Sequence, residues 1–296
     1  MNITLPDGSI RELELGSTGL DLASSIGAGL AKAALAVTVN GIQKDLNDPI
    51  NEDSKVSIIT IDSDDGLEIM RHTLTAQVLA RAVKNLFPGT KLAIGPTITD
   101  GFYYDFEFKK PISPEDLVSI EKEMKKIISS NSSITKKLIT KQESIEIFKL
   151  EGESYKESII NDSEQEDGFQ LYYQDDSKFV DLCRGPHIPS LKHIGAFKLL
   201  KIAGAYWKGN SDNKMLTRIY GTAWKNEKDL SAYLDRIEEA EKRDHRKLGK
   251  QLDLFHMQDN APGMVFWHPK GWSLWLAVED YMRQMFKDYV FPGTEA

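Results

Sequence analysis

Apolar residues alternate with polar ones at the start of the chain, and this period of two predicts β-strands. Ile3 and Leu5 precede a turn signal at residues 6–9, which reads Pro-Asp-Gly-Ser. Leu13 and Leu15 resume the alternation after the turn. The pattern therefore predicts a β-hairpin.

The apolar residues that follow lie about four apart, which is the spacing of one helix face. Residues 20–34 show this spacing and predict a helix. A strand pattern at residues 36–39 ends at the strong turn signal Asn40-Gly41. Another strand pattern at residues 56–61 completes an expected ββαββ unit over residues 1–62.

A second domain is predicted for residues 63–224. Apolar residues recur at helical intervals from 67 to 86, and this expected helix stops at Pro88-Gly89. Residues 101–108 alternate as a strand, and residues 113–116 carry the Ser-Pro-Glu-Asp signal of a helix start. Mixed helix and strand signals fill the rest of the range, so the domain is expected to be α/β.

The remaining residues predict a linker helix at 225–248 and the start of another domain at 249–296. An amphipathic helix is expected within it at residues 272–289. The end of the linker is basic and carries Lys242, Arg243, Arg246, Lys247 and Lys250. Such a cluster can contact nucleic-acid phosphates, or it can be a solvated helix surface paired with nearby glutamates. The spacing alone leaves both interpretations open.

Composition narrows the class of protein. With 41% hydrophobic residues over 296 positions the chain can bury a core, so wholesale disorder is not expected. The net charge of -8 argues against a protein that binds nucleic acid through its overall charge. The single cysteine, Cys183, excludes an internal disulfide and favours a cytoplasmic location. No apolar run approaches the roughly 20 residues of a membrane span, so no membrane partner is expected.

The densest cluster of reactive side chains is residues 181–187, which read Asp-Leu-Cys-Arg-Gly-Pro-His. Cys183 and His187 could form a nucleophile and its base, two ligands of a metal, or two groups that position water at an ester. The structural alternative is a small buried thiol beside a satisfied loop histidine. These seven residues alone do not decide among the four roles.

His72 invites a search for a second helical histidine. Ala76 and Gln77 occupy the positions four and five residues further on, and neither is a usual zinc ligand. We therefore expect no zinc site built from helical histidines together with Cys183 and His187, and no metal in this chain.

Three stretches of the second predicted domain resemble the editing domain of bacterial-type threonyl-tRNA synthetases, in the same order and at similar spacing. They are residues 101–105, 152–156 and 181–187. Four later stretches resemble the same family almost residue for residue. They are residues 203–207, 218–224, 243–247 and 261–267. Similarity of this length and order is far more specific than any single motif.

The resemblance implies an α+β multidomain fold. Residues 1–62 are then a ubiquitin-like β-grasp domain of the TGS type, and residues 63–224 an α/β editing domain. Residues 225–248 are a linker helix, and residues 249–296 are the truncated start of a class II aminoacylation domain. The helix reading given above agrees with this division.

The same resemblance implies the partners and cofactors. The first two domains and the basic linker would hold tRNA(Thr). The helix at residues 272–289 corresponds to the dimer-forming region, so a homodimer is expected for the full-length enzyme. Zinc, ATP and Mg are expected only in the C-terminal catalytic part, and no cofactor is expected in this chain. This chain by itself is therefore expected not to form threonyl-adenylate.

An editing site is needed because serine and threonine differ by one methyl group, which a binding pocket distinguishes by only about 10- to 200-fold. In the family, the second site hydrolyses seryl-tRNA(Thr). By resemblance, Lys156, Asp181, Cys183 and His187 place the amino acid and the attacking water, and Tyr104 lies close to them. Water, not a thiol, is the implied nucleophile.

The sequence departs from the family at a pair of histidines that are four residues apart. The matching positions are Thr73 and Gln77, which we group with Tyr104 as substrate-binding residues. His72 stays a catalytic candidate but lies one residue early, which rotates it by about 100° on an α-helix. We therefore expect editing to be weak or lost, and Gln77→His to raise a weak rate.

Two other functions remain open. One is a free-standing hydrolase that clears mischarged tRNA in trans, which the partial third domain with its exposed apolar helix disfavours. The other is a non-catalytic tRNA-binding module, which the missing histidines favour. Binding of tRNA(Thr) without deacylation would identify the second of these.

Overall fold

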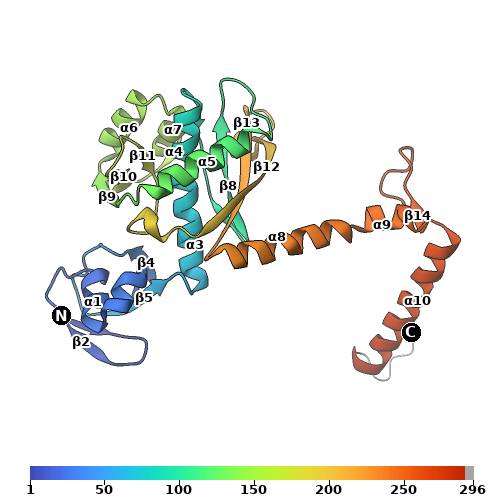
Figure 1. Ribbon diagram of the computed structural model, residues 1–296, viewed down its shortest axis with the longest axis horizontal. Helices are drawn as coiled ribbons and strands as arrows, with labels where there is room; N and C mark the ends of the chain where they lie inside the picture. The colour runs from blue at the N-terminus through green and yellow to red at the C-terminus, as the bar shows by residue number, and fades with distance from the viewer. Residues whose placement is uncertain (291–296) are drawn as a thin grey trace. The chain divides into compact units, whose positions relative to one another are not determined.

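The computed structural model describes residues 1–290 and contains two compact units, which divide between Leu230 and Ser231. The first unit begins with a five-stranded sheet in the order β2-β1-β5-β3-β4 (Figure 1). Its strands are β1 (Asn2–Thr4), β2 (Ile10–Glu12), β3 (Ala34–Val39), β4 (Ile42–Asp45) and β5 (Ser54–Thr60). Strands β1 and β5 are parallel and the other neighbours are antiparallel. This order and direction are those of a β-grasp sheet. The predicted N-terminal hairpin is confirmed, but its second strand is Ile10–Glu12 and ends before Leu13 and Leu15.

Two short helices cover this sheet where the sequence predicted one. Helix α1 (Gly19–Ile26) starts at a capping box in which Thr18 and Asp21 exchange hydrogen bonds, and α2 (Ala28–Ala33) follows. Gly27 separates them because its backbone is extended, with φ 170°. Strand β4 was not predicted, since its residues are half-exposed and carry little apolar alternation.

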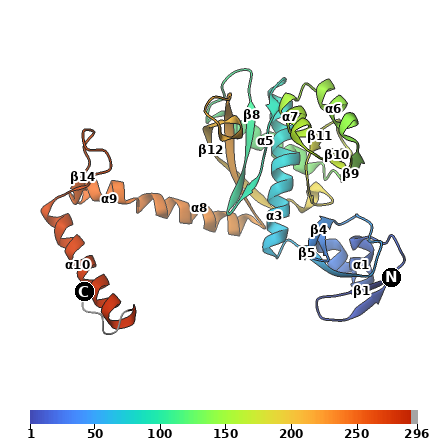
Figure 2. The ribbon, with the colours of Figure 1, turned by 180° about the vertical axis from the view of Figure 1, so that it is seen from behind.

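The second part of this unit is built on the sheet β12-β13-β8-β6, with β7 also paired to β8. The strands are β6 (Lys91–Leu92), β7 (Thr97–Ile98), β8 (Gly101–Glu107), β12 (Ala196–Tyr206) and β13 (Met215–Trp224). A long helix and α5 (Asp116–Ser129) share a hydrophobic core with this sheet (Figure 2). The core includes Phe102 and Phe106 from the sheet and Ile120 and Met124 from α5.

A smaller sheet in the order β11-β10-β9 carries its own helices. Its strands are β9 (Ile134–Ile139), β10 (Phe169–Gln174) and β11 (Val180–Leu182), and the helices are α6 (Lys141–Leu150) and α7 (Ser154–Asp162). Phe148, Ile160, Phe169 and Leu171 form the core between them. Both parts of the domain are therefore mixed α/β, as predicted. Short 3₁₀ turns lie at Leu191–His193 and Trp207–Gly209.

The long helix changes its winding in the middle. It runs through α3 (Asp64–Thr73), a π-helical segment η1 (Leu74–Leu79) and α4 (Ala80–Leu86). The N–H of Ala80 donates to the carbonyl of Thr75, five residues back, where an α-helix would use four. A π turn holds one more residue than an α turn, so it takes up one residue of register. The periodicity of the sequence predicted an uninterrupted α-helix here.

The linker helix predicted at residues 225–248 is two helices. Helix α8 (Glu227–Lys242) ends before Asp244, whose side chain accepts from the N–H of Arg246 and caps α9 (His245–Gln251). The chain continues as β14 (Phe255–His256), β15 (Phe266–Trp267), α10 (Pro269–Met285) and the π turn η4 (Phe286–Val290). The end of the last predicted segment, residues 291–296, lies outside the described residues. Among residues 1–290, no helix is both long and apolar enough to cross a membrane.

Candidate active site

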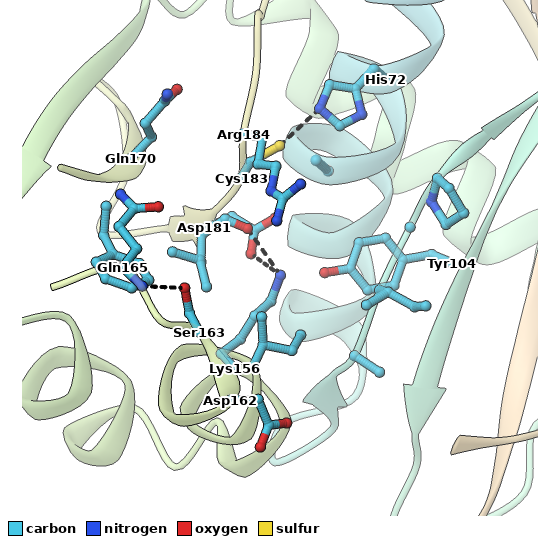
Figure 3. Close-up of a pocket in the computed structure, with 18 of the residues that line it drawn as sticks. His72, Tyr104, Lys156, Asp162, Ser163, Gln165, Gln170, Asp181, Cys183 and Arg184 are labelled. Carbon is cyan, nitrogen blue, oxygen red and sulfur yellow. Dashed lines mark hydrogen bonds and ion pairs between the residues drawn. The ribbon is translucent and has the colours of Figure 1, made fainter. Parts of the chain in front are cut away.

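A cavity of about 830 Å³ opens beside the π-helical segment, next to α7 and the loop that follows β11 (Figure 3). Its volume is within the range of small-molecule sites. The reactive side chains on its wall are His72, Tyr104, Lys156, Asp181 and Cys183. Residues from four separate sequence stretches thus meet at one cavity.

Lys156 and Asp181 form an ion pair that is almost fully buried. Their Nζ and Oδ1 atoms are 2.6 Å apart, and their side chains are 5% and 2% exposed. Burial lowers the pKa of Lys156, but Asp181 and Tyr104 together raise it by more, so the ammonium stays charged. The ammonium also donates to the carbonyl of Leu182 at 3.3 Å and lies 5.8 Å from the centre of the Tyr104 ring. The wall therefore carries one buried ion pair, in which burial raises the pKa of the Asp181 carboxyl and the Lys156 ammonium opposes that rise.

His72 and Cys183 form the second reactive pair. His72 Nε2 is 2.8 Å from Cys183 Sγ, as the dashed line in Figure 3 shows. Burial lowers the pKa of His72, because the charged imidazolium is poorly solvated there. The ring is therefore neutral at pH 7 and able to accept a proton. Sγ also lies 3.4 Å from the N–H of Gly185, which donates to it.

His187 lies behind this pair and not on the cavity wall. Its ring stacks on His72 with 4.7 Å between the ring centres and is only 2% exposed. Thr73 determines its tautomer. The Thr73 hydroxyl donates to the carbonyl of Ile69 at 2.9 Å and accepts from the N–H of Ile188 at 3.1 Å.

One contact of the Thr73 hydroxyl remains, to His187 Nδ1 at 3.0 Å. The hydroxyl has a single hydrogen, which it already donates to Ile69, so Nδ1 must carry the proton and donate. Nε2 of His187 is then a bare lone pair, and no described residue contacts it with a hydrogen bond. This unpartnered nitrogen is buried behind the cavity wall.

In Thr73→Val we expect the proton of His187 no longer to be held on Nδ1. In Thr73→Ser we expect it to stay on Nδ1, as in the wild type. Valine removes the acceptor of the Nδ1–H bond, whereas serine retains a hydroxyl at the same place. Nitrogen-15 NMR of the labelled histidine rings measures which nitrogen of His187 is protonated. An Nδ1–H tautomer that persists fully in the valine variant would contradict the role given to Thr73.

His72, which the sequence placed one residue early and about 100° away from the family position, lies on the cavity wall. The π-helical segment takes up the one-residue offset that we derived for His72, so its ring reaches Cys183. Thr73 and Gln77, the expected substrate-binding residues of this helix, are fully buried and do not line the cavity. Gln77 instead accepts two hydrogen bonds from Gln174 Nε2, at 2.7 Å and 3.2 Å. Ala76 occupies the cavity wall, so the reason for expecting a gain from Gln77→His no longer holds.

Three side chains could together hold a metal ion. One ligand atom each from His72, Cys183 and His187 lies within 4.8 Å of the others. Catalytic zinc sites use three protein ligands and a water, so the donor set and spacing are compatible with zinc. The sequence predicted no metal, and that remains a prediction.

Several cavity residues were missed from the sequence. Asp162, Ser163, Gln165, Gln170 and Arg184 line the cavity together with the reactive pairs (Figure 3). Arg184 was inside the cluster at 181–187 but received no role. The others come from the end of α7, the polar loop after it and a position in β10, without a characteristic spacing, so no signal in the single sequence identifies them.

The five basic residues predicted to bind tRNA are all exposed, on α8 and α9 and the turn between them. Three of them form ion pairs within their own segment. Lys242 pairs with Glu238 and Glu239, and Arg243 with Glu239. Arg246 pairs with Asp244. Both readings of this cluster therefore stay open.

Two family models match the chain. Residues 1–60 match the TGS domain, and residues 170–220 match the threonyl and alanyl tRNA synthetase second additional domain. The second match includes Asp181, Cys183 and His187. Its range covers part of residues 63–224, so the boundaries of that predicted domain stay a prediction.

The chain is also similar to bacterial threonine–tRNA ligases over nearly its whole length. It is 54% identical to the protein of Methylococcus capsulatus over 286 residues, which are 97% of the chain and 44% of that ligase. The identity to the ligase of Hahella chejuensis is 53%, over 97% of the chain and 45% of that protein. The identity to the ligase of Janthinobacterium is 51%, over 100% of the chain and 46% of that protein. The chain thus spans slightly less than half the length of these relatives.

Proposed function

Since this chain is homologous to the N-terminal part of bacterial threonine–tRNA ligases, we propose that its cavity hydrolyses the ester of Ser-tRNA(Thr). The observation that carries this proposal is the meeting of two pairs on one wall. Lys156 with Asp181 supplies fixed charges, and His72 with Cys183 supplies a proton acceptor. Such a wall can bind a small amino acid ester and activate water.

The charged pair would hold the substrate. A seryl ester carries an ammonium and a carbonyl, so the Asp181 carboxylate suits the first and the Lys156 ammonium suits the second. A donor aimed at the carbonyl oxygen stabilises the negative charge that develops there during attack. Because this pair is buried in a confined cavity, its charges are screened less than at the surface.

The neutral imidazole of His72 would take the proton from water. The resulting hydroxide adds to the ester carbonyl, the bond from the carbonyl carbon to the ribose oxygen breaks, and His72 returns the proton to that oxygen. The products are free serine and tRNA(Thr). Cys183 keeps its thiol and orients His72 through the 2.8 Å contact.

We propose the other properties for the whole ligase. The partner of this chain is tRNA(Thr), with Lys242, Arg243, Arg246, Lys247 and Lys250 contacting its phosphates. Residues 249–296 begin a class II aminoacylation domain, and ATP, Mg, zinc and the homodimer interface belong to the complete enzyme in the cytoplasm.

Deacylation of purified Ser-tRNA(Thr) by the full chain tests the proposal. We expect Ser-tRNA(Thr) to be hydrolysed about 10- to 200-fold faster than Thr-tRNA(Thr), the range that one methyl group allows. The weak or lost editing that the sequence suggested rested partly on a displaced His72, which the structure corrects. If the chain binds tRNA(Thr) and leaves the seryl ester at its spontaneous rate, it is a binding module instead.

A further inference from the structure

The N-terminal domain contributes a side chain to the surroundings of the cavity. Asp45 ends β4, and its Oδ1 accepts from the backbone N–H of His187 at 2.7 Å. Its Oδ2 accepts from the hydroxyl of Tyr172 at 2.8 Å. One carboxylate of residues 1–62 is thus bonded to two residues of the second domain.

Tyr172 contacts both Asp45 and the ring of His187. The Tyr172 and His187 rings pack edge to face, with 4.3 Å between their centres and 79° between their planes. Burial and the neighbouring Asp45 carboxylate raise the pKa of Tyr172, so its hydroxyl stays protonated and donates. Gln170 Oε1 lies 3.1 Å from the same hydroxyl and is the more distant acceptor.

The loop before His187 is shaped to this tyrosine. Gly185 has φ +64°, and a Cβ built there would lie 2.1 Å from the Tyr172 hydroxyl oxygen. Only glycine lets the chain pass over the hydroxyl in this conformation. The backbone between Cys183 and His187 therefore depends on where Tyr172 is held.

Lys136 fixes the carboxylate from the other side. Its Nζ is 3.0 Å from Asp45 and 2.5 Å from Asp48, and the side chains of Lys136 and Asp45 are 17% and 12% exposed. Asp48 shares this lysine with Asp45, but its hydrogen bonds go to Lys136 and to the backbone of Asp45, not to His187 or Tyr172. Asp48 therefore supports Asp45, through Lys136 and the Asp45 backbone N–H at 3.3 Å, whereas only the Asp45 carboxylate contacts the site.

We propose that Asp45 is a positioning residue for the hydrolytic site, so that a carboxylate of the N-terminal domain holds His187 and Tyr172 in their working geometry. The expected effect of Asp45 on the rate of Ser-tRNA(Thr) hydrolysis rests on the proposed function. It makes the N-terminal domain a structural part of the cavity and not only an appended tRNA-binding element.

The test compares Asp45→Ala with Asp48→Ala in the full chain. For Asp45→Ala we expect kcat for Ser-tRNA(Thr) hydrolysis to fall at least about 10-fold with little change in KM, because a displaced catalytic group slows chemistry more than binding. For Asp48→Ala we expect a change under about 2-fold, since the site contacts stay intact. Tyr172→Phe is a milder variant that keeps the ring and the fold and removes one of the two bonds to Asp45.

A second readout does not depend on activity. The ring resonances of His187 should shift or broaden in NMR spectra of Asp45→Ala and, less strongly, of Tyr172→Phe, and should stay in place in Asp48→Ala. Equal effects of the two alanine variants, or unchanged His187 resonances in Asp45→Ala and Tyr172→Phe, would overturn the proposal. If the wild type does not deacylate Ser-tRNA(Thr) but the His187 signals respond as expected, the proposed function fails while the positioning contact stands.

Discussion

The variant His72→Ala is expected to hydrolyse Ser-tRNA(Thr) about 10²- to 10⁴-fold more slowly than the wild type, the usual contribution of a general base. His72 lies on the cavity wall beside Cys183, and burial lowers its pKa from the ordinary value of 6.5. The measurement is the single-turnover rate of deacylation at saturating protein. His193→Ala serves as the control, because His193 does not line the cavity.

The pH profile gives an independent check of this assignment. A general base works when it is unprotonated, so the rate should hold as pH falls and decline only below 6.5. The decline is at lower pH than for an ordinary histidine because the folded protein disfavours the imidazolium. An undiminished rate in His72→Ala would assign the proton transfer to another group, with the bare Nε2 of His187 as the next candidate.

The largest effect on stability is expected for Asp181→Asn. The substitution leaves the Lys156 ammonium buried without a countercharge, and breaking a buried pair in this way costs about 3–5 kcal/mol in the free energy of unfolding. Urea denaturation followed by circular dichroism measures the loss. Glu166→Gln is the matched control, because its partner Lys141 is 3.3 Å away and the Glu166 side chain is 80% exposed. That control should cost less than about 1 kcal/mol.

A double variant separates stability from chemistry. Lys156→Met with Asp181→Leu removes both charges, and such replacements of buried pairs are often neutral or stabilising. We therefore expect the double variant to recover most of the stability and none of the hydrolysis. A double variant that is as unstable as Asp181→Asn would show that packing, and not the unpaired charge, causes the loss.

Local signals in the sequence predicted the elements that local chemistry determines. The strand around Ile3 and the turn at Asn40-Gly41 are present in the N-terminal sheet, whereas the strand predicted at Leu13 and Leu15 lies earlier, at Ile10–Glu12. The dense cluster at residues 181–187 forms part of the cavity wall. For the strands and the turn, neighbouring residues decide the conformation, so one sequence is sufficient, whereas the cluster was identified by its composition and is held by residues far away in the chain.

Other features depend on residues far apart in the chain. The π turn at residues 74–79 has no periodic signature, because all of its side chains are buried and every one is compatible with an α-helix. The bond from His187 to Asp45 joins residues 142 positions apart. Spacing arguments along a single element cannot detect such a contact. The rotation of about 100° that we derived for His72 was wrong because it assumed an uninterrupted α-helix.

The π-helical segment η1 also lets the two halves of the long helix, α3 and α4, pack independently of each other. Residues before it, such as Met70, and residues after it, such as Val83, are both fully buried. A rigid α-helix with one extra residue would have to turn one of these halves out of its core by about 100°. Confining the misfit to six residues lets each half keep its own neighbours. The π segment thereby shifts the helix register next to the cavity, while the hydrophobic contacts at both ends are preserved.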